Sequence, residues 1–189
     1  MSVSEVLRRI SAALDRAGVT YMLPGSFASA HYGAPRSTLD IDIVIAADPE
    51  QLRTFVQSLP SGEYYADLDA ALEAHKCESL FNVIDLATGW KIDLIVRKSR
   101  AFSREELSRR QLVRVQGLPL YLASAEDVVI TKLEWSKLAE SQRQIEDVAA
   151  ILRLRWDSLD QPYLEKWISQ LNLAEEWSNA KGIAGVSGR

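Results

Sequence analysis

Apolar residues recur along this chain with two periods, one typical of helices and one typical of strands. From Ser4 to Ala17 they recur every three or four residues, which places them on one face of a helix. From residue 39 to 46 the sequence LDIDIVIA alternates polar and apolar positions, which is the period of a half-buried strand. The same reasoning predicts further strands at 19–23, 80–86, 90–96, 112–115 and 118–122, and further helices at 27–32, 49–59, 67–76, 103–110, 125–138, 141–154, 161–171 and 173–180.

The order of these elements predicts an α+β (mixed α/β) fold with a short mixed sheet flanked by helices. A short gap that contains Gly89 predicts a β-hairpin between the two strands on either side of it. After Ala123 only helices are expected, and Ser124 with an acid three residues later is typical of a helix start. We therefore expect a core at residues 1–123, a helical C-terminal part packed on it at 124–181, and a flexible tail at 182–189.

The composition indicates a folded protein of a reducing compartment. Of the 189 residues, 47% are hydrophobic, which is enough for a sizeable core. The single cysteine, Cys77, cannot build a disulfide framework. The first residues, MSVSEVLRRI, lack the apolar region of a signal peptide, and no run approaches the roughly 20 apolar residues of a membrane span. We therefore expect a cytoplasmic protein that does not associate with membranes.

Three acidic residues on apolar strands are the candidates for a catalytic or metal-binding role. Asp40 and Asp42 point to one face of their strand, because side chains two positions apart share a face. Two such carboxylates repel each other unless a cation lies between them, and Mg2+, or Mn2+ in its place, is the natural oxygen-bound candidate. Asp93 lies within the apolar sequence WKIDLIV on another strand. The alternative is that the pair simply lies on a solvated face of the sheet.

The turn before the acidic strand adds a candidate for phosphate binding. Gly25-Ser26 stands where a strand leads into a short helix, and backbone N–H groups at such a turn can hold a phosphate. The chain contains no GxxxxGK[ST], no GxGxxG after a strand and no HExxH. The three carboxylates and the turn are therefore the group of residues that suits a known type of reaction, namely metal-assisted phosphoryl or nucleotidyl transfer.

These residues resemble the motif of the DNA polymerase β-like nucleotidyltransferase superfamily. That motif is Gly-Ser, a spacer, Asp-x-Asp and a later acid on its own strand, which Gly25, Ser26, Asp40, Asp42 and Asp93 match in order. The sequence RSTLDID at residues 36–42 is most similar to the AbiEii-type branch of minimal nucleotidyltransferases, which includes toxins of toxin–antitoxin pairs.

The resemblance implies an enzyme that moves a nucleoside monophosphate from an NTP, such as ATP, to a hydroxyl group. It implies that Asp40 and Asp42 hold Mg2+, and that Asp93 holds a second metal ion or takes the proton of the attacking hydroxyl. The nucleotide-binding residues that it implies lie in the turn, in the approach to the acidic strand and in a later helix: Gly25, Ser26, Arg36, Ser37 and Lys132. Arg36 has the alternative of an ordinary surface arginine.

The C-terminal part carries a weaker similarity to the same branch. EDVVITKLEWSK followed by RQIEDVAAIL matches a helix with a lysine and then a helix with an aspartate, here Lys132 and Asp147, with Arg143 between them. Lys132 would contact the nucleotide and Asp147 would be structural. The alternative is that both are ordinary exposed helical charges.

A basic segment raises the question of the acceptor. Residues 97–114 carry seven Lys or Arg against two Glu, whereas the whole chain has a net charge of −4. Such a segment can contact the phosphates of RNA, or it can be a solvated helix and loop. RNA is the acceptor that an AbiEii-type toxin implies, with an antitoxin protein as partner. The alternatives are a small-molecule adenylyltransferase of the antibiotic-modifying type and a non-catalytic nucleotide-binding module.

Overall fold

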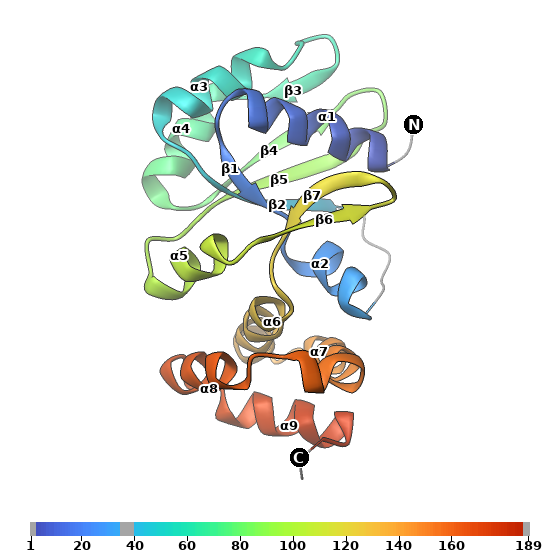
Figure 1. The fold of residues 1–189 in the computed structure, drawn as a ribbon. Coiled ribbons are helices and arrows are strands. Elements are labelled where there is room, and N and C mark those ends of the chain that lie inside the picture. The colour runs from blue at the N-terminus through green and yellow to red at the C-terminus, as the bar shows by residue number, and fades with distance from the viewer. Residues whose placement is uncertain (1–2, 35–39, 187–189) are drawn as a thin grey trace. The chain divides into compact units, whose positions relative to one another are not determined.

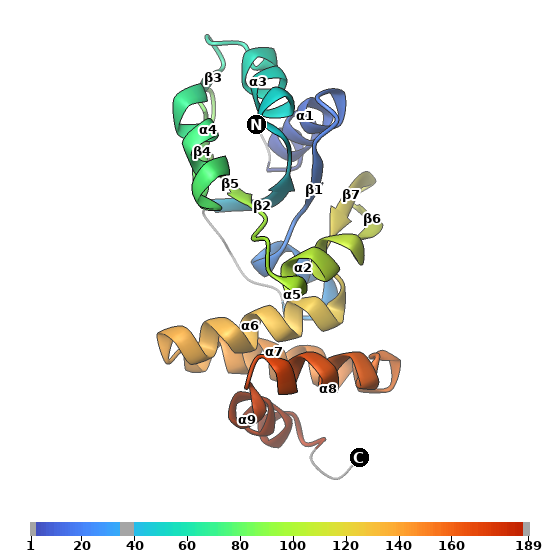
Figure 2. The same cartoon turned by 90° about the vertical axis from the view of Figure 1, so that its left-hand side faces the viewer.

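The computed structural model describes residues 3–34 and 40–186, which form two compact units (Figures 1 and 2). The first, which we call the sheet unit, comprises Met1–Leu23 and Ser37–Leu122. The second, which we call the helical unit, comprises Pro24–Arg36 and Ala123–Arg189. The chain therefore crosses from one unit to the other three times, and each unit is described by itself.

The sheet unit is built on a mixed five-stranded sheet. Its strand order is β1 (Thr20–Met22), β2 (Asp40–Ala46), β5 (Lys91–Val96), β4 (Leu80–Asp85) and β3 (Tyr64–Ala66). Strands β2 and β5 are parallel, and the other neighbours are antiparallel. The unit also contains the hairpin of β6 (Gln111–Val115) and β7 (Leu118–Leu122), and the helices α1 (Val3–Arg16), α3 (Pro49–Ser58), α4 (Leu68–Cys77) and α5 (Ala101–Ser108).

One face of this sheet carries the core of the unit. Along β2 the residues Ile41, Ile43 and Ile45 are fully buried, and in β5 they are joined by Ile92 and Leu94. Helices α1, α3 and α4 lie on this side of the sheet (Figures 1 and 2). Because side chains alternate along a strand, the polar residues of β2 and β5 point to the opposite face. The apolar half of the alternation thus fixes where the acidic half must lie.

Side-chain caps start two helices at the positions that the sequence predicts. The Asp48 side chain accepts a hydrogen bond from the Gln51 backbone, and the Gln51 side chain accepts one from the Asp48 backbone, so α3 starts with a complete capping box. Ser124 caps α6 (Ala125–Ala139) by accepting a hydrogen bond from the backbone N–H of Asp127. These interactions join residues three apart, which is why the sequence reveals them.

The helical unit consists of a short helix from the first half of the chain and the helices of the C-terminal part. These are α2 (Gly25–Tyr32), α6 (Ala125–Ala139), α7 (Gln142–Arg155), the 3-10 turn η1 (Trp156–Ser158), α8 (Gln161–Gln170) and α9 (Ala174–Ala184). Helix α2 is joined to the others by Tyr32, whose hydroxyl donates to the Ala123 carbonyl at 2.9 Å and whose ring lies under the Arg155 guanidinium. Burial raises the pKa of this hydroxyl to about 12, so Tyr32 remains a donor throughout the neutral range.

The predicted α+β fold class is confirmed, and the structure corrects several boundaries. Helix α2 begins at Gly25 rather than at residue 27, and α5 begins at Ala101 rather than at residue 103. Strand β3 and the turn η1 were not predicted, because three residues are too few to show a period. Helix α9 continues to Ala184, past the start of the tail expected at residue 182, and residues 187–189 of that tail lie outside the described residues. Residues 24–36 group with the helices rather than with residues 1–123.

Candidate active site

The register of the sheet brings the three predicted carboxylates onto one face. Asp42 of β2 is paired directly with Asp93 of β5, and Asn82 of β4 is paired with Asp93 from the other side. Asp40 lies two residues before Asp42 and is paired with Lys91, which lies two residues before Asp93. We call Asp40, Asp42 and Asp93 the carboxylate face. It lies on the side of the sheet opposite the buried isoleucines.

Two neighbours hold the carboxylate of Asp93. The Asn82 amide nitrogen Nδ2 donates to Asp93 Oδ1 at 2.5 Å. The Lys91 ammonium lies 3.1 Å from Asp93 Oδ2 and 3.8 Å from Asp40 Oδ1. The Asp93 side chain is only 14% exposed, whereas those of Lys91 and Asp40 are 44% and 53% exposed. The face is therefore enclosed at Asp93 and open to solvent at Asp40.

The electrostatics of the face are those of crowded negative charges. Burial raises the pKa of Asp42, the carboxylates of Asp93 and Asp40 raise it further, and the ammonium of Lys91 opposes them. The hydrogen bond to Asp93 and that carboxylate's charge raise the pKa of Lys91. Additional positive charge at this face would therefore stabilise the ionised acids.

The donor set suits a hard divalent cation, although the side chains are not arranged around one. Carboxylate oxygens are the ligands that Mg2+ and Mn2+ prefer, and an added cation would offset the repulsion by which Asp93 and Asp40 add to the effect of burial on the pKa of Asp42. Within residues 3–34 and 40–186, no group of three or more His, Cys, Asp or Glu is gathered closely enough to hold a metal ion as it stands. A positive charge of the chain itself, the Lys91 ammonium, lies 3.1 Å from Asp93 Oδ2. The assignment of Asp40, Asp42 and Asp93 as catalytic and metal-binding residues stays a prediction.

The predicted phosphate-binding turn, Gly25-Ser26, belongs to the helical unit. Gly25 has a φ of 57° at the start of α2, a left-handed conformation that glycine adopts without strain. Pro24 provides no side-chain cap, so the first N–H groups of α2 have no capping side chain there. Their role and that of Ser26 in binding phosphate stay predictions. Arg36 and Ser37 lie outside the described residues.

Lys132 lies in a buried ion pair between helices α6 and α7. Its ammonium lies 2.8 Å from Asp147 Oδ2 and donates to Gln144 Oε1 at 2.9 Å. The side chains of Lys132 and Asp147 are each 7% exposed. The alternative that both are ordinary exposed charges is therefore wrong, whereas Arg143 between them is exposed. The nucleotide contact predicted for Lys132 stays a prediction.

The family of the chain follows from comparison with known proteins. Residues 1–181 match the family described as "Nucleotidyltransferase of unknown function (DUF6036)". The chain belongs to this nucleotidyltransferase family. No curated protein matches the sequence. The match confirms the nucleotidyltransferase superfamily, and the AbiEii-type branch stays a prediction.

Solved structures confirm the fold of this nucleotidyltransferase. An antigenic nucleotidyltransferase-like protein from Paracoccidioides brasiliensis superposes with a TM-score of 0.57 at 16% identity, over 94% of this chain and 91% of that chain. ANT(2")-Ia in complex with adenylyl-2"-tobramycin gives a TM-score of 0.57 at 15% identity, over 89% and 95%. A solution structure of the antibiotic-resistance factor ANT(2'')-Ia gives 0.55 at 15% identity, over 91% and 93%.

Two residues that lie beside the carboxylates, Lys91 and Asn82, were not predicted from the sequence of this nucleotidyltransferase. Lys91 could have been found, because it stands two positions before Asp93 in a strand and so shares its face. Asn82 could be found only with the register of the hairpin, since β4 and β5 pair Asn82 with Asp93 across 11 positions of sequence. The alternation of side chains along a strand thus reveals Lys91, whereas only the observed strand pairing reveals Asn82.

The basic segment 97–114 starts at the far end of β5 from the carboxylates. Asp93 is the third residue of β5, and Arg97 follows its last residue, so about 13 Å of strand separates them. Several of its guanidinium groups bind local carbonyls: Arg97 that of Lys98, Arg104 that of Ser99, Arg110 that of Leu107 and Arg114 that of Gly117. These contacts do not neutralise the arginines, so the segment keeps its positive charge.

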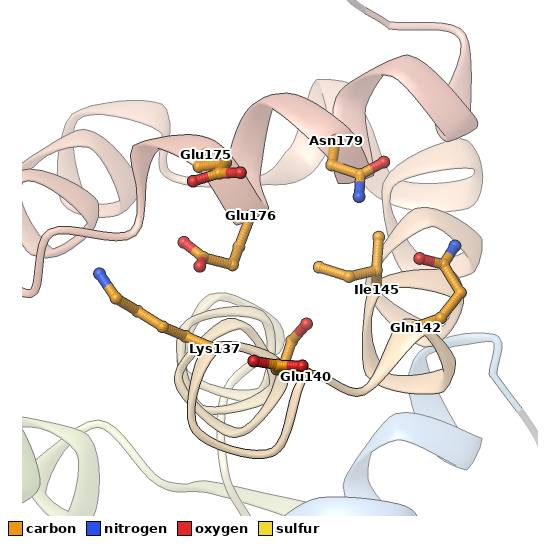
Figure 3. Close-up of a pocket in the computed structure, with 8 residues that line it drawn as sticks. Lys137, Glu140, Gln142, Ile145, Glu175, Glu176 and Asn179 are labelled. Carbon is orange, nitrogen blue, oxygen red and sulfur yellow. The ribbon is translucent and has the colours of Figure 1, made fainter.

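A hollow of about 230 Å3 lies in the helical unit between α6, α7 and α9 (Figure 3). None of the predicted site residues that the structure describes lines it. Its charged lining consists of three glutamates and one lysine. The lining residues are Ser136, Lys137, Glu140, Gln142, Ile145, Glu175, Glu176 and Asn179.

None of the helices in the described ranges combines the length and the apolar character that crossing a membrane requires.

Proposed function

We propose that this nucleotidyltransferase transfers a nucleoside monophosphate from an NTP, such as ATP, to a hydroxyl acceptor with the help of Mg2+. The observation that carries the proposal is the register of β2 and β5, which pairs Asp42 with Asp93 on the face that also bears Asp40. Three carboxylates on adjoining parallel strands would provide oxygen ligands for a cation that binds a triphosphate.

Each residue of the carboxylate face would have its own role in the reaction. Asp40 and Asp42 would hold Mg2+, or Mn2+ in its place, and Asp93 would complete the set or accept the proton of the acceptor hydroxyl. The hydroxyl oxygen forms a bond to the α-phosphorus, and the bond from this phosphorus to the pyrophosphate breaks. The Asn82 amide fixes the orientation of the Asp93 carboxylate through its hydrogen bond. The metal, when bound, neutralises the charge on the phosphate oxygens.

The nucleotide contacts belong to the same proposal. Gly25 would let the phosphates approach the backbone, and Ser26 would donate its hydroxyl and N–H to them. Arg36 would offer a bidentate contact, and Ser37 and Lys132 would complete the set. These assignments rest on the similarity of the motif, and Lys132 would first have to leave its bond to Asp147.

The decisive experiment measures pyrophosphate release from each NTP with Mg2+ and with EDTA, in a mixture of RNA and small hydroxyl compounds. Asp40→Asn, Asp42→Asn and Asp93→Asn should each abolish release while the fold is retained. The matched control is Asp48→Asn, which removes a carboxylate from the same unit at a helix cap where asparagine serves equally well. Release that persists in Asp42→Asn, or that is lost equally in Asp48→Asn, would contradict the proposal.

RNA is the acceptor that the basic segment favours. Seven basic residues in 18 positions suit a strand with several phosphates, and the net charge of −4 weakens attraction at long range. Labelling of total RNA should weaken with salt and should fall when Arg104, Arg109 and Arg110 are changed together to Gln. The control changes Arg8, Arg16 and Arg53 of the same unit to Gln. Equal labelling and equal salt dependence in both triple variants would show that the segment is only a solvated surface.

A small hydroxyl compound is the second candidate acceptor. The chain matches ANT(2")-Ia over nearly its whole length, and that protein was solved with adenylyl-2"-tobramycin. The same labelled reaction, run with aminoglycosides in place of RNA, tests this candidate. Labelled aminoglycoside without labelled RNA would move the assignment to the antibiotic-modifying type.

The toxin role and the non-catalytic alternative complete the proposal. The AbiEii-type sequence at residues 36–42 supports a toxin, with an antitoxin protein as partner. A toxin should arrest growth on expression, and Asp42→Asn should relieve the arrest. NTP binding without pyrophosphate release under any acceptor condition would instead favour a nucleotide-binding module.

A further inference from the structure

The carboxylate face contains a cation of its own. Lys91 is paired with Asp40 and lies two positions before Asp93, with its ammonium within 4 Å of an oxygen of both Asp40 and Asp93. Its partner on the other side is Ile84 of β4, which offers no charge. The ammonium is therefore held toward the acids by the arrangement of the strands.

We propose that Lys91 is an internal counter-ion of the carboxylate face and that it competes with the divalent metal for Asp40 and Asp93. The proposal rests on the function proposed above, which assigns these carboxylates to the metal. In the metal-free chain Lys91 reduces the repulsion among the three acids. For the metal to bind, the ammonium has to leave the carboxylate oxygens, so Lys91 weakens the affinity for the metal alone.

The geometry permits this exchange. The Lys91 side chain is 44% exposed and has a flexible four-carbon stem, so its ammonium can move to solvent without disturbing the core. Asp93 keeps the hydrogen bond from Asn82 when the lysine leaves, so its carboxylate stays oriented. Departure of Lys91 therefore frees oxygens of Asp40 and Asp93 while Asn82 still positions Asp93.

The test measures Mn2+ binding to the full chain without nucleotide, by calorimetry and by the water-proton relaxation of bound Mn2+. Lys91→Met and Lys91→Gln remove the charge, and Lys91→Arg keeps it. The matched control is Lys76→Met, which removes an exposed lysine that lies 3.4 Å from Glu73 in the same unit. Asp42→Asn reports whether the metal binds at the carboxylate face at all.

The dissociation constant for Mn2+ should fall about three- to tenfold in Lys91→Met and Lys91→Gln at low ionic strength, and less as salt screens the charge. It should stay unchanged in Lys91→Arg and Lys76→Met. In EDTA the two neutral variants should unfold at a lower temperature than the wild type, and Mn2+ should raise their midpoint more.

Two results overturn different claims. Wild-type or weaker Mn2+ affinity in both neutral variants, with binding still lost in Asp42→Asn, overturns the role of Lys91 and leaves the metal site standing. Wild-type Mn2+ affinity in Asp42→Asn, or no binding in any variant, overturns the metal site and the role of Lys91 together.

Discussion

The negative charge on Asp42 lowers the stability of the folded chain. Burial and the neighbouring acids raise its pKa above the ordinary value of 3.8, because they disfavour the ionised form in the folded state. Folding therefore becomes less favourable as the pH rises through the folded-state pKa of this group. Such a residue is retained at a cost in stability, which fits a role in binding a cation.

Asp42→Asn should raise the unfolding temperature of the metal-free chain at pH 7, because the amide carries no charge. The difference from the wild type should be full above the folded-state pKa of Asp42, shrink as the pH falls, and vanish below 3.8, where Asp42 is protonated in both states. Thermal unfolding in EDTA between pH 3 and 8 measures it. A variant that is less stable than the wild type at pH 7 would contradict this account.

Lys132 and Asp147 form a pair whose halves depend on each other. Lys132→Met should lower the free energy of unfolding by about 3 kcal/mol, because it leaves the Asp147 carboxylate buried without its cation. Lys132→Met combined with Asp147→Leu should recover part of this loss. Denaturant unfolding measures both variants.

The same variants separate the two roles of Lys132. A structural role predicts that Lys132→Met keeps its affinity for an ATP analogue under conditions where it is folded. Loss of that affinity with unchanged stability would show instead that Lys132 contacts the nucleotide.

At the scale of the element, helix α2 ends on a glycine that no other residue can easily replace. Gly33 has a φ of 117°, which side chains rarely adopt, and its N–H bonds the Ser29 carbonyl. A Cβ placed there would lie 2.3 Å from Leu154 Cδ1. Leu154 is 69% exposed and can rotate away, so the backbone strain outweighs the clash.

Gly33→Ala should therefore lower the free energy of unfolding by about 1–2 kcal/mol, from the left-handed conformation alone. The loss should be equally large in a Leu154→Ala background. Gly62→Ala is the matched control, because nothing lies within 4 Å of its added Cβ and its φ is not in the left-handed region. Rescue of Gly33→Ala by Leu154→Ala would show that the clash, not the strain, is decisive.

At the scale of the whole molecule, each of the two units is built from two separate segments of the chain. Helix α2 comes from the first half of the sequence, yet it packs on α6 and α7 with Ala28 and Tyr32 buried. The N-terminal half is therefore not a self-contained domain, because it carries an apolar helix whose partners lie beyond residue 122.

A fragment of residues 1–122 should expose the apolar face of α2 and self-associate. Replacement of residues 24–36 in that fragment by a Gly-Ser linker of equal length should restore a monomer, because it removes the unpartnered helix. Sedimentation and binding of an apolar dye measure both fragments against the full chain. Equal association of the two fragments would locate the exposed surface elsewhere.

Features that depend on residues close together in the chain could be predicted from the sequence alone. The period of LDIDIVI placed Asp40 and Asp42 on one face, and Asp48 with Gln51 marked the start of α3, because these relations span two or three positions. Length and composition excluded none of the alternatives for the acceptor.

Which strands pair, and in which register, became known only from the folded structure. The pairing of Asp42 with Asp93 spans 51 positions, and the place of α2 among the C-terminal helices spans about a hundred. Such contacts depend on the combined burial of many apolar side chains, which no local pattern specifies. For the same reason the sequence left Lys132 as a possible surface charge, while the packing of α6 on α7 buried it beside Asp147.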